Sequence, residues 1–185
     1  MKHTQFIIKY LFMLCLVLLL IQCKHANTES QPETPSKDLN GGAVSELYQY
    51  YVENPSLQAH KDENLIIDYI VENELIYERL PSGLYYKIVK QGSGDNYKIG
   101  DNCVTHYNGY FLDGNSFDSS YKRNEPIRFR VGQMNPSWNE ILQIVNPGTQ
   151  VKIIAPSRLA YGERGFPGYV PPNTVIAFDI ETIAG

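Results

Sequence analysis

The chain has 185 residues, 43% of them apolar and 19% charged, a composition typical of a globular protein rather than a disordered one. Its net charge of −4 is unevenly spread, since residues 24–81 carry four basic and eleven acidic side chains. No basic stripe is present, so nucleic acid is a poor partner candidate. The acidic segment indicates a solvated helix face and a linker.

The first residues have the pattern of an export signal. A short basic stretch ends at Lys9, and Leu11–Ile21 is an unbroken apolar run of 11 residues. That length suits a signal peptide and is shorter than the roughly 20 residues of a membrane span. The run ends in Gln22-Cys23 and then turns polar, which resembles the lipobox of bacterial lipoproteins. We therefore predict a signal peptide over residues 1–22 and lipidation of Cys23; an uncleaved anchor is the alternative.

The three cysteines agree with this arrangement. Cys15 lies in the signal, and Cys23 is the predicted acylation site. Cys103 is then the one thiol left, which excludes an internal disulfide. Its place in an apolar strand predicts a core residue.

Two segments precede the main domain. Residues 23–42 are rich in Ser, Thr, Asn, Pro and Glu, which predicts a flexible tether. Residues 43–81 predict helices over Val44–Val52 and Asp62–Tyr77. The apolar face of the second helix is expected at Leu65, Ile66, Tyr69, Ile70 and Ile76. A free helix of this length is marginal in water, so it docks either on the main domain or on a second copy, making a homodimer.

Residues 82–185 change to the alternating rhythm of strands. The expected strands are Leu84–Val89, Cys103–Leu112, Ile127–Val131, Val151–Ala155 and Thr174–Ile183. One helix interrupts them, with Ser137 predicted as its N-cap and Glu140 at N3, and with Leu142 and Val145 continuing the face of Trp138. The fold class is therefore α+β, an antiparallel sheet with one short helix.

The sequence contains no candidate residues for several common kinds of active site. The sequence holds no glycine-rich phosphate loop, and its four histidines lack metal-ligand spacing. No serine or cysteine lies in a nucleophile motif. We expect no metal and no cofactor.

Four separated motifs in the main domain share one family order. They are Thr105–Tyr110 (THYNGY), Leu112–Ser120 (LDGNSFDSS), Ala160–Gly165 (AYGERG) and Pro171–Glu181 (PPNTVIAFDIE). Together they resemble FKBP-type peptidyl-prolyl cis/trans isomerases of the bacterial lipoprotein type, most of all those associated with gliding motility. The resemblance implies a curved antiparallel sheet wrapped around a short helix, with an isomerase site between them.

The resemblance also implies the site residues. Tyr107, Asp118 and Tyr161 are the expected catalytic residues. The expected substrate-binding residues are Phe117, Arg123, Ile127, Phe129, Trp138, Val170 and Phe178. The expected clients are proline-containing exported polypeptides. The expected location is the cell envelope, lipid-anchored on the outer membrane and facing the periplasm.

The sequence departs from the family pattern at three places. The loop from Gly132 to Trp138 is shortened, Ile127 replaces a larger aromatic residue, and Phe166 replaces a common histidine. The short loop puts substrate hydrogen bonding and macrolide binding in question. The alternative function is a catalytically weak FKBP-like binding or chaperone module of an envelope assembly.

Overall fold

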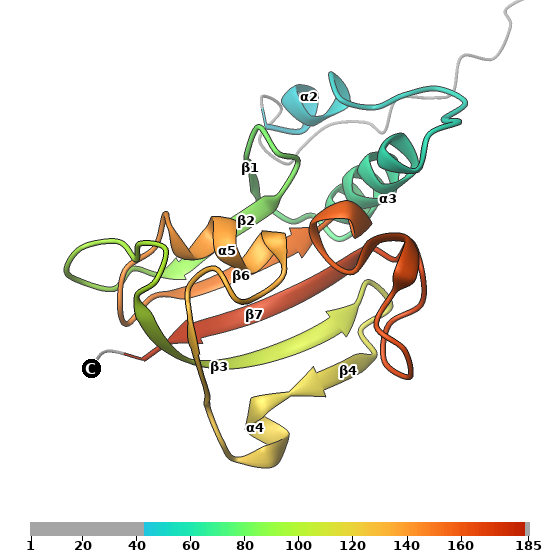
Figure 1. Cartoon of the computed structure of the whole chain (residues 1–185). Helices are drawn as coiled ribbons and strands as arrows, with labels where there is room; N and C mark the ends of the chain where they lie inside the picture. The colour runs from blue at the N-terminus through green and yellow to red at the C-terminus, as the bar shows by residue number, and fades with distance from the viewer. Residues whose placement is uncertain (1–42, 184–185) are drawn as a thin grey trace, which may run out of the picture. The chain divides into compact units, whose positions relative to one another are not determined.

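The computed structural model describes residues 43–183. The predicted signal peptide, the lipidation site Cys23 and the tether over residues 23–42 lie outside the described residues. Residues 43–81 and 82–183 belong to one compact unit. Figure 1 shows this unit as a curved sheet with one helix in its concave side and another against its opposite side.

The sheet has seven strands, and every neighbouring pair is antiparallel. They are β1 Glu78–Arg79, β2 Tyr85–Lys90, β3 Asn102–Phe111, β4 Ser116–Ser119, β5 Ile127–Arg130, β6 Gln150–Ala155 and β7 Ile176–Thr182. Their order is β1-β2-β6-β7-β3-β4, and β5 also pairs with β3. The five predicted strands are confirmed within one or two residues, whereas β1 and β4 were not predicted because they are short.

The two faces of the sheet carry separate cores, as the alternation in β7 shows. Ile176, Phe178 and Ile180 are buried in the core on one face. Ala177 is buried in the other. The predicted alternation is confirmed, and it lets β7 serve both cores, since successive side chains point to opposite faces.

Helix α5, Pro136–Leu142, fills the concave face and buries Trp138, Ile141 and Leu142. The predicted N-cap was wrong. The cap is Asn135, whose Oδ1 accepts the Trp138 backbone N–H at 3.1 Å and the Ser137 hydroxyl at 2.8 Å. Pro136 takes the first helical position, because its fixed φ suits a helix start and its missing N–H is not needed there.

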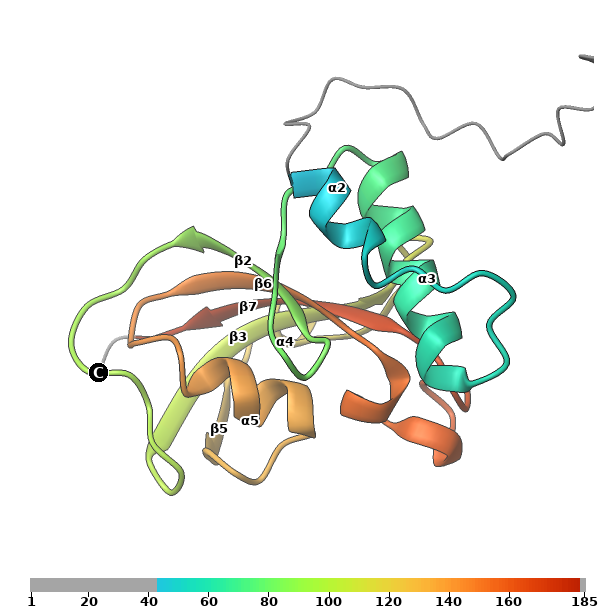
Figure 2. The same cartoon turned by 90° about the horizontal axis from the view of Figure 1, so that it is seen from above.

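Helix α3, Gln58–Glu72, packs on the opposite face, as Figure 2 shows from above. Its buried side chains Ile66, Ile67 and Ile70 share a core with Tyr85, Ile154 and Ala177. The helix docks on this chain's own sheet, which is one of the two options that the sequence left open. A homodimer through Asp62–Tyr77 stays a prediction.

The predicted bounds and apolar face of α3 need correction. The helix ends at Glu72, and Asn73 is its C-cap. Glu74 then adopts a positive φ of 55°, a left-handed conformation that cannot continue a right-handed helix. Ile76 therefore lies beyond the helix and is exposed. Leu65 is 51% exposed, whereas Ile67, which the prediction left out, is buried together with the predicted Ile66 and Ile70.

The other described helices are short. Helix α2 is Ala43–Tyr48 and stops before the predicted Val52, whose backbone N–H and carbonyl are both hydrogen-bonded by the Asn64 side chain. Helix α4 is Ser120–Arg123, and the 3-10 turns η1 and η2 are Ser157–Leu159 and Gly162–Arg164. Within residues 43–183, no helix combines the length and the hydropathy that crossing a bilayer requires.

Candidate active site

An aromatic cluster lies between α5 and the concave face of the sheet. Its centre is Trp138, which is 1% exposed. The rings of Tyr107, Phe129 and Phe178 meet the indole edge-on, with centroids 5.3, 5.8 and 5.4 Å away. Phe117 packs edge-on against Phe178 at 5.7 Å. Such edge-to-face contacts are favoured by the ring quadrupoles and hold the rings in defined orientations.

A glycine in β3 makes this cluster possible. Gly109 pairs with Phe178 in the neighbouring strand β7. A Cβ added at Gly109 would lie 2.7 Å from the Phe117 ring and 2.8 Å from the Phe178 ring. Both rings therefore rest directly on the Gly109 backbone. We did not predict a role for Gly109; its place in the motif Thr105–Tyr110, two residues after Tyr107 on the same strand face, was the available signal.

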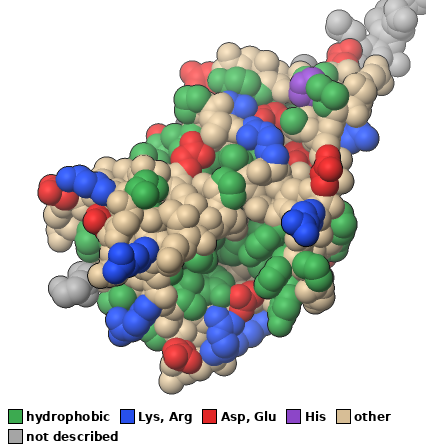
Figure 3. Space-filling view, in the orientation of Figure 1, with side chains coloured by type: hydrophobic (Ala, Val, Ile, Leu, Met, Phe, Trp, Pro, Cys, Tyr) green, Lys and Arg blue, Asp and Glu red, His purple; other side chains and the backbone are tan. Residues whose placement is uncertain are grey.

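The cluster is not sealed from solvent. Phe117, Ile127, Phe129 and Tyr161 are half-buried around it, and Val170 is buried beside them. Figure 3 shows hydrophobic side chains gathered in the middle of this face, with acidic and basic side chains at the border of the patch. The rings thus form an apolar surface that a ligand can reach from one side.

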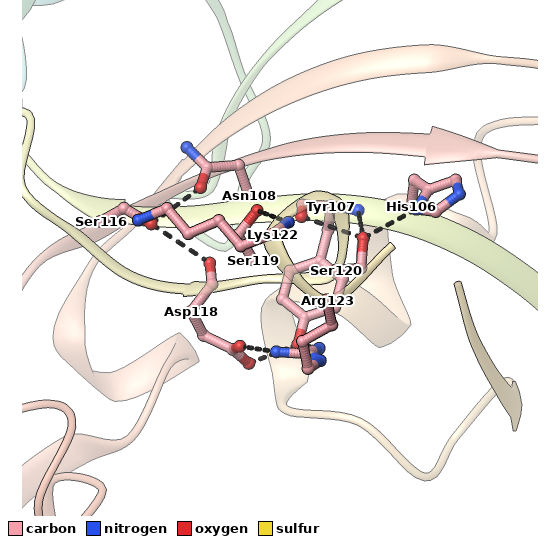
Figure 4. A network of polar contacts seen from close by, with 9 residues as sticks. All are labelled: His106, Tyr107, Asn108, Ser116, Asp118, Ser119, Ser120, Lys122 and Arg123. Atoms are coloured by element: carbon pink, nitrogen blue, oxygen red, sulfur yellow. Dashed lines mark hydrogen bonds and ion pairs between the residues drawn. The ribbon is translucent and has the colours of Figure 1, made fainter. Parts of the chain in front are cut away.

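Three polar groups meet at the border of the cluster. Asp118 accepts a hydrogen bond from the Tyr107 hydroxyl and forms an ion pair with Arg123. Arg123 also donates to the Tyr107 hydroxyl oxygen at 3.0 Å, which closes the triangle shown in Figure 4. The two hydrogen bonds leave the carboxylate fixed in orientation beside the rings.

The contacts in this triangle shift the pKa values of Asp118 and Tyr107 in opposite directions. Burial raises the pKa of Asp118, but the hydrogen bonds from Tyr107 and Arg123 lower it by more, so that it lies below its usual value. Burial, and then the hydrogen bond to Asp118, raise the pKa of Tyr107. Asp118 is therefore a carboxylate and Tyr107 a neutral phenol at neutral pH.

Two serines fasten α4, which carries Arg123, to the sheet. Ser120 is fully buried, and its hydroxyl accepts the Tyr107 backbone N–H at 2.7 Å and lies 3.0 Å from His106 Nδ1. Ser119 caps α4 by accepting the Lys122 N–H. The sequence motif alone assigned no role to this serine pair; its contacts hold α4, and with it Arg123, beside Tyr107.

The structure brings the predicted site residues together. The apolar and aromatic ones belong to a single core cluster: Tyr107, Phe117, Ile127, Phe129, Trp138, Tyr161, Val170 and Phe178. Asp118 and Arg123 join that cluster through Tyr107. Tyr161 also stacks on Phe166, with centroids 5.3 Å apart. The individual roles of these residues in binding or catalysis stay predictions.

The short loop before α5 is held by hydrogen bonds within the chain. The Gly132 N–H donates to Asn139 Oδ1 at 2.9 Å, and Asn139 Nδ2 donates to the Met134 carbonyl at 2.6 Å. The Gln133 N–H donates to the Arg130 carbonyl at 3.0 Å. These contacts use several of the backbone groups next to the aromatic cluster.

Comparison with known proteins places this site in a family. The model of the FKBP-type peptidyl-prolyl cis-trans isomerases matches residues 94–183. The crystal structure of AtFKBP13 is 34% identical with a TM-score of 0.56, and the match covers 98% of that chain and 59% of this one. The chain belongs to the FKBP-type peptidyl-prolyl cis-trans isomerase family. In this FKBP-type chain, α2 and α3 precede the matched range.

Longer relatives show the same domain. FkpA of Escherichia coli (strain K12) is 41% identical over 102 residues, which are 55% of this chain and 37% of FkpA. The crystal structure of FkpA from Escherichia coli is 31% identical with a TM-score of 0.61, and the match covers 78% of this chain and 64% of that one. The matched FKBP-type region thus spans less than two fifths of the curated FkpA sequence.

Among the described residues, two other kinds of site, a metal centre and a reactive thiol, find no support. Within residues 43–183, no group of three or more His, Cys, Asp or Glu side chains is arranged to hold a metal ion. Cys103 is 1% exposed, and burial raises the pKa of its thiol. The prediction that Cys103 is a core residue is confirmed.

Proposed function

We propose that this FKBP-type chain accelerates cis/trans isomerisation of X-Pro bonds in polypeptide clients. The observation that carries the proposal is the half-open ring cluster over Trp138 with the fixed Asp118 carboxylate at its border. Such a surface offers an apolar binding surface for a proline ring and polar groups at its border for the adjoining peptide backbone.

The reaction needs no covalent chemistry. Rotation about an X-Pro bond must cross a barrier of roughly 18–20 kcal/mol because it breaks amide resonance. The two planar isomers differ by only about 0.5–1 kcal/mol. A site accelerates rotation if it binds the twisted amide better than either planar form. Each ~1.4 kcal/mol of that preference raises the rate about tenfold.

The described residues suit this preference. A planar amide is strongly dipolar and well solvated, whereas a twisted amide has less charge separation. Contact with the half-buried rings of Phe117, Phe129 and Tyr161, which pack over the Trp138 cluster, therefore disfavours the planar forms more than the twisted one. Burial raises the pKa of Tyr161 by more than a hydrogen bond with Asn135 lowers it, and the charge of Asp118 adds a smaller increase. Tyr161 therefore stays a neutral phenol able to donate to a client carbonyl.

Isomerase activity is tested directly with the detergent-solubilised chain and a protease-coupled proline tetrapeptide assay. The proposal predicts a rate above the uncatalysed one, and a variant Trp138→Ala or Phe178→Ala that loses most of the gain. A wild-type rate equal to the uncatalysed rate would reject it, since uncatalysed exchange takes tens of seconds and is readily measured.

The second candidate is a binding or chaperone module with little turnover. The loop from Gly132 to Trp138 favours it, because Asn139 holds two of its backbone groups in hydrogen bonds within the chain. Binding of a proline-rich peptide without faster isomerisation would support this candidate over the first.

We further propose that the chain is exported and anchored by acyl groups on Cys23, facing the periplasm from the outer membrane. The support is the pattern of residues 1–23. Stable anchoring takes more than one acyl chain, so the mature N-terminus should carry several. Mass spectrometry of the membrane-bound protein tests the modification, and Cys23→Ala should release the chain from the membrane fraction. Its clients would be exported proteins that contain proline.

A further inference from the structure

The first turns of α3 bury a carboxylate that the sequence placed on a solvated face. Asp62 is 2% exposed. Its Oδ2 accepts both the backbone N–H of Ser157 at 2.8 Å and the Ser157 hydroxyl at 2.6 Å, across 95 residues of sequence. Its Oδ1 accepts from Gln58 Nε2 at 2.7 Å. A buried carboxylate is costly unless hydrogen-bonded, so these donors account for the burial of Asp62.

The partner of Asp62 begins the segment that carries Tyr161. Ser157 is itself 2% exposed and starts η1, four residues before Tyr161. We call residues 157–173 the Tyr161 loop. It also contributes Val170, which is buried in the aromatic core cluster. Figures 1 and 2 both show the N-terminal end of α3 next to this loop.

The Tyr161 loop is closed on itself and attached at its start. The Asn173 N–H donates to the Gly162 carbonyl at 2.8 Å, and Phe166 and Val170 exchange two backbone hydrogen bonds of 2.8 Å. Gly165 lies so close to the Val170 carbonyl that a Cβ there would be 2.4 Å from it. The loop therefore behaves as one piece, and Asp62 holds that piece where it leaves β6.

The next residue, Glu63, attaches α3 to the sheet instead. Its carboxylate accepts two hydrogen bonds from Arg79, at 2.8 and 3.0 Å, and one from the Tyr85 hydroxyl. Arg79 belongs to β1 and Tyr85 to β2. Two adjacent carboxylates thus serve different neighbours: Glu63 holds α3 on the sheet, and Asp62 holds the Tyr161 loop on α3.

We infer that Asp62 is a positioning residue for the isomerase site, acting through Ser157 on Tyr161. The inference rests on the proposed function. It makes α3, which precedes the matched family range, a support of the site. Without the Asp62 contacts, the Tyr161 loop keeps its internal hydrogen bonds and the contact of Arg158 with the Ser82 carbonyl, but it loses its attachment to α3 at Ser157. Tyr161 and Val170 then shift relative to Trp138.

The test compares four variants of the full chain, assayed well below their unfolding temperatures. Asp62→Ala should lower kcat/KM roughly tenfold, because small misplacements of a site group are costly in rate. Asp62→Asn should stay within about threefold of wild type, because its amide oxygen can still accept from Ser157. Ser157→Ala, which keeps the backbone donor, should fall between them.

Glu63→Gln is the matched control, because it weakens the docking of α3 without touching Ser157. It should lower the unfolding temperature at least as much as Asp62→Ala while kcat/KM stays within about twofold. If the loss of kcat/KM instead follows the loss of stability across all four variants, Asp62 is merely structural and the inference is wrong.

Hydrogen exchange separates this inference from the proposed function. Amides of residues 157–173 should exchange faster in Asp62→Ala than in Glu63→Gln, whether or not the wild type is active. An inactive wild type with this exchange pattern rejects the isomerase proposal and keeps the attachment. An active wild type whose loop exchange is unchanged in Asp62→Ala rejects the attachment alone.

Discussion

The Tyr107 hydroxyl donates a hydrogen bond to the Asp118 carboxylate, joining the inner face of β3 to the neighbouring strand β4. Arg123 contacts both groups from α4. The carboxylate is therefore held next to the rings by two donors, and a peptide bound at the proposed site would meet it in a fixed orientation.

Removing this carboxylate should impair catalysis more than stability. Asp118→Asn keeps the shape but loses the charge, and we expect kcat/KM to fall roughly tenfold, as for an interaction made mostly in the transition state. The measurement is the tetrapeptide assay beside a urea titration. Asp95→Asn, an exposed carboxylate in a turn, is the control and should leave both unchanged. Equal activity of the two variants would contradict a role for Asp118.

The pH dependence of stability follows from the same contacts. The folded pKa of Asp118 is lowered, so its stabilising contribution is complete above the unfolded value of about 3.9 and is lost as the pH falls through the folded pKa. The difference in unfolding free energy between wild type and Asp118→Asn should therefore be constant above a pH of about 5 and shrink below about 4. Urea titrations across this range measure it; a difference that grows on acidification would contradict the assignment.

Gly109→Ala should disturb the aromatic cluster. The added Cβ would lie within 2.8 Å of both the Phe117 and the Phe178 ring, so the rings must move. We expect a loss of about 1–3 kcal/mol in unfolding free energy, as for overpacking in a core. The fluorescence of Trp138, the chain's one tryptophan, should change too. The double variant Gly109→Ala/Phe117→Leu makes room for the methyl group and should recover part of the loss; no recovery would argue against this contact as the cause.

Glu63→Ala should be among the more destabilising substitutions of α3. It leaves Arg79, whose side chain is 16% exposed, without its partner. Breaking a buried ion pair from one side costs roughly 3–5 kcal/mol, and this pair's partial exposure puts the expected loss near the lower end. Lys152→Ala breaks the exposed pair with Asp179 and should cost less than about 1 kcal/mol. Urea unfolding of both variants provides the comparison, and similar losses would contradict it.

Local patterns predicted the strands well where a single rule decided the outcome. Alternation in β7 predicted one shared face for Ile176, Phe178 and Ile180, and all three do lie in the same core cluster. The same rule missed β1 and β4, which are two and four residues long and too short to show a period. For α5, the capping pattern placed the N-cap at Ser137, but Pro136, just before it, takes the first helical position, so the cap is Asn135.

Long-range contacts explain the errors in α3. We expected its acidic residues on a solvated face, yet Asp62 and Glu63 are buried. Their partners Ser157 and Arg79 lie 95 and 16 residues away. Nothing in the helical periodicity reveals those partners, and without them a buried carboxylate would be too costly to predict.

The sequence by itself determined the family, the strand pattern and the set of residues around Trp138, because motif spacing and side-chain alternation are local properties of the chain. The tertiary structure alone decided that Gly109 seats two rings, that Ser120 ties Tyr107 to α4, and that Asp62 holds the Tyr161 loop. Each of these depends on which distant groups meet in space, and the free energy of a buried polar or crowded group is set by those neighbours.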